Sequence, residues 1–87
     1  MKDKNGIYYY PYLDNKKVKM YIRQIEDTIE FRLWNDDDPM LWMEHGWVSY
    51  DAIQQASAIY DGKQFDPKKT YDIHIARSLL KKENMAS

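Results

Sequence analysis

The chain has 87 residues, no cysteine and a formal net charge of −1. A chain of this length buries one modest core, so we expect a single domain over residues 1–87, frayed at 1–6 and 83–87. The lack of cysteine excludes disulfides and thiolate chemistry, and no apolar run reaches the ~20 residues of a membrane span or resembles a signal peptide. We therefore expect a cytoplasmic protein with no membrane association.

The small net charge conceals a segregation of charge along the chain. Residues 36–62 contain six acidic side chains and no lysine or arginine, whereas residues 1–35 and 63–87 each carry a positive excess. Such patches steer partners without identifying them. We expect a surface with separate acidic and basic regions.

Three runs near the start of the chain are expected to form strands. Residues 7–13 include Pro11, which cannot donate to a ladder and so indicates an edge strand. Residues 17–25 and 29–35 alternate between apolar and polar side chains, which is typical of half-buried antiparallel strands. Residues 14–15 suit a hairpin turn. The pattern predicts a three-stranded antiparallel meander.

The acidic middle of the chain is expected to begin with a short helix at 38–46. Asp38 is a candidate N-cap, Pro39 suits the first helical position, and Gly46 is a stop signal. A short strand over 40–44 is the alternative.

Residues 48–62 carry the clearest helical pattern. Ser49 is a suitable N-cap, and Asp51 lies in the first turn, where the helix dipole favours an anion. Gly62 marks the end. The apolar side chains that share one face of this helix are Ala52, Ile53, Ala56, Ile59 and Tyr60.

The last segment, 65–84, predicts a further helix that starts at Asp66 and Pro67. Residues 71–75 also alternate, so a strand before a shorter helix remains open. The side chains that form the helical stripe are Ile75, Ala76, Leu79 and Leu80.

Together these elements indicate an α+β fold, in which two or three short helices follow the meander and pack on one face of it. The apolar side chains expected beneath the helices are Ile7, Tyr9, Leu13, Val18, Met20, Ile22, Ile29, Phe31 and Leu33. The other face of the sheet would then be open to solvent.

The open face is expected to mix aromatic rings with charged groups. Its predicted members are Tyr8, Tyr10, Tyr12, Tyr21 and Trp34, with Lys17, Lys19, Arg23, Arg32 and Glu30 between them. Tyrosine, tryptophan and arginine are the residues enriched in interface hot spots. We predict that a protein partner or a second copy of the chain contacts Tyr8, Tyr10, Tyr12, Tyr21, Arg32 and Trp34.

Two other interpretations of this face stay open. Aromatic and aromatic–cation pairs also stabilise a sheet face that has only water beside it. Rings next to cations can instead bind single-stranded nucleic acid, with bases stacked on the rings and phosphates on Lys17, Lys19 and Arg23. The net negative charge disfavours the nucleic-acid interpretation.

The sequence contains no pattern typical of an enzyme or a cofactor site. The two histidines, His45 and His74, share no metal-ligand spacing, no serine lies in a nucleophile elbow, and the three glycines are isolated. The acids at 36–38, with Glu44 and His45, could supply ligands to a hard cation, but a solvated turn with a helix cap is favoured there. We predict a non-enzymatic protein without metal or cofactor.

Trp42 and Trp47 have two interpretations. We favour a place in the core, where they would close the end of the sheet–helix layer. The alternative is an acidic-rimmed surface, rich in methionine and aromatic residues, that binds a basic helix or peptide.

Overall fold

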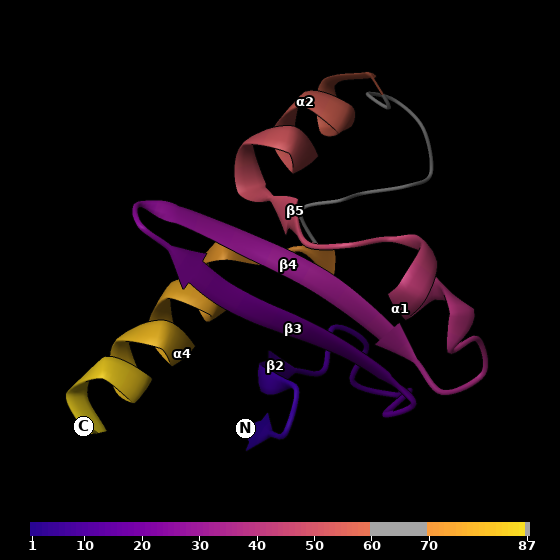
Figure 1. The fold of residues 1–87 in the computed structure, drawn as a ribbon, viewed down its shortest axis with the longest axis horizontal. Helices are drawn as coiled ribbons and strands as arrows, with labels where there is room; N and C mark the ends of the chain where they lie inside the picture. Colours follow the sequence, from indigo (N-terminus) through magenta and orange to yellow (C-terminus); the bar gives the residue numbers. More distant parts are fainter. Residues whose placement is uncertain (60–69, 87) are drawn as a thin grey trace.

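The computed structural model describes residues 1–59 and 70–86, with side chains described for 1–56 and 70–83 (Figure 1). Within these described ranges, five strands form one antiparallel sheet in the order β1-β2-β3-β4-β5. The strands are β1 (Lys2–Asp3), β2 (Gly6–Tyr9), β3 (Val18–Ile25), β4 (Thr28–Asn35) and β5 (Val48–Ser49). The helices are α1 (Met40–Glu44), α2 (Tyr50–Ile59) and α4 (Ile73–Ala86).

The predicted α+β class with an antiparallel sheet is confirmed, but the sheet has five strands rather than three. The central hairpin of β3 and β4 closely follows the predicted runs, whereas β2 ends at Tyr9, two residues before Pro11. The additional strands β1 and β5 have two residues each, which is too short for an alternating pattern to reveal. Residues 1–6, expected to fray, include β1, which pairs with β2 through Lys2 and Ile7.

The core lies between one face of the sheet, which we call the first face, and helices α2 and α4. Met20 and Phe31 are fully buried there. The buried residues of this cluster are Tyr9, Met20, Ile22, Phe31, Ile53, Ile73, Ala76 and Leu80. The hydroxyl of Tyr9 donates to the carbonyl oxygen of Thr70 at 2.7 Å and accepts from the backbone N–H of Asp72 at 2.9 Å, so it ties β2 to the start of α4.

Three side chains predicted to face the core are exposed: Leu13, Ala52 of α2 and Ile75. Leu13 is 88 % exposed, because the strand ends before it. Ile75 is 41 % exposed, because the buried side of α4 is formed by Ile73, Ala76 and Leu80. Asp72 caps this helix by accepting the N–H groups of His74 and Ile75 on Oδ1, at 2.9 and 3.2 Å. Residues 73–75 are therefore helical and not a strand.

Of the N-caps predicted for the other two helices, the structure confirms the cap of α2 but not that of α1. The hydroxyl of Ser49 accepts the N–H of Ala52 at 3.2 Å, which confirms the predicted cap of α2, with Asp51 in the first turn. Helix α1 forms as predicted, but Pro39 is its N-cap residue and Asp38 makes no side-chain cap. The predictions for Ile59, Tyr60, Gly62, Asp66 and Pro67 lie outside the residues whose side chains are described.

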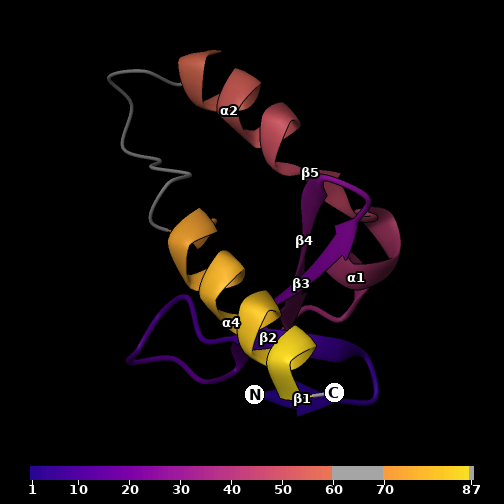
Figure 2. The ribbon, with the colours of Figure 1, turned by 90° about the vertical axis from the view of Figure 1, so that its left-hand side faces the viewer.

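The helices do not all pack on one face. Figure 2 shows α4 on one side of β3 and β4 and α1 on the other side. Arg32 holds α1 there, because its Nε donates to the carbonyl oxygen of Trp42 at 3.2 Å and its Nη2 donates to the same atom. The face that α1 contacts, which we call the second face, is therefore partly covered.

The turn between β3 and β4 contains a strained residue. Ile25 pairs with Thr28, so Glu26 and Asp27 form a two-residue turn, and Glu26 has φ 56°. A side chain with a Cβ disfavours this left-handed conformation, whereas glycine adopts it freely. We expect Glu26→Gly to raise the free energy of unfolding by about 1 kcal/mol, measured by urea denaturation.

Asp27→Gly is the matched control, because Glu26 is the one residue other than glycine with positive φ in the described chain. It should leave stability unchanged or lower it. Equal loss of stability in both variants would contradict the assigned turn.

Candidate aromatic interaction face

Among the residues whose side chains are described, six aromatic rings form one connected group on the second face, which we call the aromatic cluster. Its members are Tyr8, Tyr10, Tyr21, Trp34, Trp42 and Trp47. The centroids of neighbouring rings are 5.2 to 6.4 Å apart, with interplanar angles from 52° to 80°. These tilted and edge-to-face arrangements are the favourable ones for aromatic pairs.

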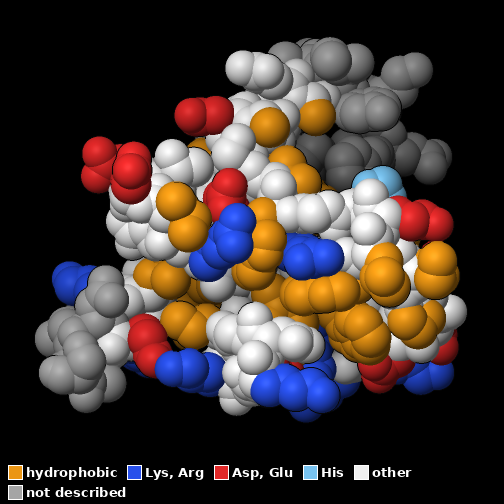
Figure 3. Space-filling model, in the orientation of Figure 1, with side chains coloured by type: hydrophobic (Ala, Val, Ile, Leu, Met, Phe, Trp, Pro, Cys, Tyr) orange, Lys and Arg blue, Asp and Glu red, His pale blue; other side chains and the backbone are white. Residues whose placement is uncertain are grey.

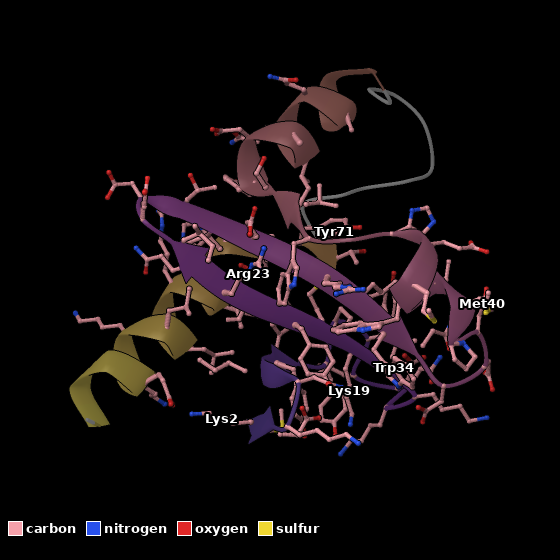
Figure 4. All side chains as sticks on the ribbon, viewed as in Figure 1. Lys2, Lys19, Arg23, Trp34, Met40 and Tyr71 are labelled. Atoms are coloured by element: carbon pink, nitrogen blue, oxygen red, sulfur yellow. The ribbon has the colours of Figure 1, made fainter. Side chains whose placement is uncertain are left out.

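Strand register explains how the sheet contributes its part of the cluster. Tyr8 pairs with Tyr21 across β2 and β3, and Tyr21 pairs with Arg32 across β3 and β4. Lys19 pairs with Trp34 in the same ladder. Because directly paired residues point to the same side of a sheet, these side chains share the second face. Figure 4 shows Lys19, Arg23 and Trp34 on this side of the sheet.

Tyr21 is the buried centre of the cluster rather than an exposed contact residue. Only 2 % of its surface is exposed, because the rings of Tyr8 and Trp42 pack against it. Its hydroxyl donates to Oδ2 of Asp3 at 2.6 Å. Burial, with a smaller effect of this hydrogen bond, raises the pKa of Tyr21 above its ordinary value. The sequence prediction of an exposed Tyr21 is wrong because alternation gives the side of a residue and not what covers it.

Asp3 links β1 to the cluster. It accepts the Tyr21 hydroxyl and the backbone N–H of Asn5, the latter at 2.8 Å, and lies 3.6 Å from Nζ of Lys19. Burial acts to raise the pKa of Asp3, but these hydrogen bonds and the lysine charge hold it below its usual value. The carboxylate is therefore stabilised in its charged form.

Cations lie over the rings of the cluster. Nζ of Lys19 is 4.8 Å from the centroid of Tyr8, and the guanidinium of Arg32 is 4.0 Å from the centroid of Trp42. The guanidinium of Arg23 is 4.4 Å from the centroid of Trp47, and its Nε donates to Oε1 of Glu30 at 2.6 Å. These contacts hold the rings in fixed positions.

Two predicted members of the open face lie elsewhere or at its margin. The hydroxyl of Tyr12 is 3.1 Å from Oγ1 of Thr70, the residue that also binds Tyr9, so Tyr12 lies toward the first face. The alternation does not continue past Pro11, since β2 has already ended. Lys17 precedes β3 and pairs with Asp37 at 3.4 Å.

Trp42 and Trp47 are the members that the favoured sequence interpretation misplaced. Both are half-buried in the aromatic cluster and neither belongs to the core between the sheet and α4. Helix α1 has no fully buried residue, and Met40 and Met43 are 57 % and 77 % exposed. Figure 3 shows hydrophobic side chains gathered over α1 and the adjoining strands. The sequence feature that could have indicated this surface is the methionine and tryptophan content of α1, because a five-residue helix is too short to bury all of these side chains.

Acidic side chains lie just before α1 and at its end. Asp36 accepts the indole N–H of Trp34 at 2.6 Å, while Asp36, Asp38 and Glu44 are exposed. Among the described residues, no group of three or more histidine or carboxylate side chains is arranged to hold a metal ion.

Comparison with known proteins finds no matching family model, no matching curated protein and no matching solved structure. None of the helices in the described parts of the chain combines the length and apolar composition needed to cross a bilayer.

The buried phenols make stability depend on alkaline pH. Burial raises the pKa of Tyr9 and Tyr21 above the ordinary value of 10.0. The unfolded chain therefore loses these protons first, so stability is fully present below about pH 10 and falls as the pH rises above it. We expect the phenolate absorbance to rise in two steps, the second together with loss of circular dichroism; one step without unfolding would contradict the burial.

Proposed function

We propose that the protein is a non-enzymatic interaction protein and that the aromatic cluster, extended by Met40 and Met43, binds another protein. The observation that supports this most is that five of the six rings keep part of their surface in solvent, although every ring packs on another. Tryptophan, tyrosine, arginine and methionine are the residues enriched in protein interfaces. The proposal includes a cytoplasmic location and no cofactor.

The contacts that hold the side chains of this face also support this role. Arg32 binds the backbone of α1 and stacks on Trp42, and Arg23 is held by Glu30 against Trp47. Binding to a surface whose side chains are already ordered costs less conformational entropy than binding to a mobile one. The half-exposed rings can therefore contribute their apolar area to an interface at low cost.

Charge favours a partner with basic groups beside an apolar surface. Asp36 and Asp38 are exposed just before α1, and Glu44 is exposed at its end, next in sequence to the exposed Met43. A basic amphipathic segment would match both the acidic rim and the apolar centre.

The runner-up, binding of single-stranded nucleic acid, has less support. Each of its three proposed phosphate-binding residues has an internal acidic partner: Lys17 has Asp37, Lys19 has Asp3 and Arg23 has Glu30. Binding phosphate would mean breaking these pairs. A labelled single-stranded oligonucleotide titrated at low and high salt should show no binding; steep salt-dependent binding would favour the runner-up.

Site-specific photo-crosslinking tests the proposed face. A photo-reactive amino acid at Met43, in the protein expressed in its native host, should form a covalent adduct with one defined protein, whereas the same residue at the exposed Ile75 of α4 should not. Tyr10→Ala should lower the affinity of the purified pair about tenfold, because Tyr10 is a half-exposed ring of the cluster.

The result that would overturn the proposal is an adduct from position 75 and none from position 43. An adduct with a second copy of the chain, with sedimentation showing a concentration-dependent dimer that Tyr10→Ala weakens, would identify the partner as the protein itself.

A further inference from the structure

A pocket of about 480 Å³ lies on the first face, away from the aromatic cluster. Its lining comes from the end of the β3–β4 hairpin, the first turn of α2 and residues 73–81 of α4. Its apolar lining consists of Ile29, Tyr50, Ile73 and Leu80, which belong to the core cluster or pack against it. Part of the core therefore borders this pocket.

Charged side chains of opposite sign reach the pocket from different elements. Asp27 comes from the hairpin turn and Asp51 from the first turn of α2, whereas Arg77 and Lys81 both come from α4. Arg77 and Lys81 are four residues apart, so they project from the same side of the helix. The lining therefore combines two carboxylates, from the hairpin turn and α2, with two cations from α4.

These four charges are available to a ligand. Within the parts of the chain with described side chains, none of them forms an ion pair or a side-chain hydrogen bond with another residue. A carboxylate is well matched to Arg77 and Lys81, and an ammonium group to Asp27 and Asp51. The apolar lining suits an aliphatic or aromatic body between the two charged ends.

We propose that this pocket binds a short apolar peptide with both termini free, in the size class of a dipeptide. Its volume falls within the ~300–1,000 Å³ typical of small-molecule sites. The peptide's ammonium group lies toward Asp27 and Asp51, its carboxylate lies toward Arg77 and Lys81, and its side chains contact Ile73 and Leu80. The proposal is independent of the aromatic face, because the two sites share no residue.

The test uses three probes: the dipeptide leucyl-leucine, its N-acetyl form and its C-terminal amide. Titration is followed by amide chemical shifts in NMR spectra of the full chain. We expect saturable binding of leucyl-leucine with shifts at residues lining the pocket, and about tenfold weaker binding of each blocked form, because each loses one charged contact.

Variants identify which charged side chains bind which end of the dipeptide. Arg77→Gln should lower the affinity for leucyl-leucine about tenfold but leave the affinity for its C-terminal amide unchanged. Asp51→Asn should lower the affinity for leucyl-leucine about tenfold but leave the affinity for the N-acetyl form unchanged. Both side chains are exposed, so the fold is retained, and Lys17→Gln on the far side is the matched control. No saturable binding, equal binding of all three probes, or shifts confined to the aromatic cluster would each overturn the proposal.

Discussion

Phe31→Ala is expected to lower the free energy of unfolding by about 3–5 kcal/mol. Phe31 lies in β4 and is completely buried. The centroid of its ring is 5.6 Å from that of Tyr71, which it meets edge-on, and 6.3 Å from that of the tilted Tyr50 ring. Truncation removes the apolar contact and leaves a cavity between the sheet and the helices. Because small domains have only about 5–15 kcal/mol of stability, much of the variant should be unfolded well below the melting temperature of the parent.

Urea denaturation followed by circular dichroism measures this effect. Ile75→Ala is the matched control, since Ile75 is 41 % exposed and should cost less than about 1 kcal/mol. If Ile75→Ala lowered the free energy of unfolding as much as Phe31→Ala is expected to, this would contradict the assignment of the buried side of α4 to Ile73, Ala76 and Leu80.

Tyr21→Ala is expected to cost nearly as much as Phe31→Ala, about 3–4 kcal/mol, although it lies on the opposite face. Its ring is buried between Tyr8 and Trp42. Tyr21→Phe keeps the ring and loses only the hydrogen bond to Asp3, so it should cost about 1–2 kcal/mol. The hydroxyl of Tyr21 therefore accounts for part of the free energy lost in Tyr21→Ala, and the ring accounts for the rest.

The variant Asp3→Asn tests whether the loss in Tyr21→Phe comes from the hydrogen bond between Tyr21 and Asp3. Combined with Tyr21→Phe, it should cost less than the sum of the single changes, because the two residues contribute one interaction. If Tyr21→Ala cost less than about 0.5 kcal/mol, as surface substitutions do, the second face would be an open layer and not a packed cluster.

The alternating pattern predicted the two sides of the central hairpin. Val18, Met20 and Phe31 are buried as expected, while Trp34 and Arg32 lie on the opposite side. In a strand, successive side chains point to opposite faces, so this part follows from local sequence alone.

The covering of the second face could not be predicted in the same way. Alternation does not reveal that Trp42 of α1 packs on Tyr21, because a five-residue helix has no period that fixes which side it presents. Arg32 holds α1 by donating to the backbone carbonyl oxygen of Trp42. Every residue carries such a carbonyl group, so the sequence does not indicate which one Arg32 binds. The position of Tyr12 depended on where β2 ends, and element boundaries are the least certain part of sequence-based prediction.

The placement of Trp42 is the contact on which the aromatic face depends, and nuclear Overhauser effects of its indole protons test it most directly. We expect cross-peaks to the ring of Tyr21 and to the side chain of Arg32, whose protons should be shifted upfield by the indole ring. Cross-peaks from Trp42 to Ile73 and Leu80 in their place would put the indole in the core and contradict the proposed interaction face.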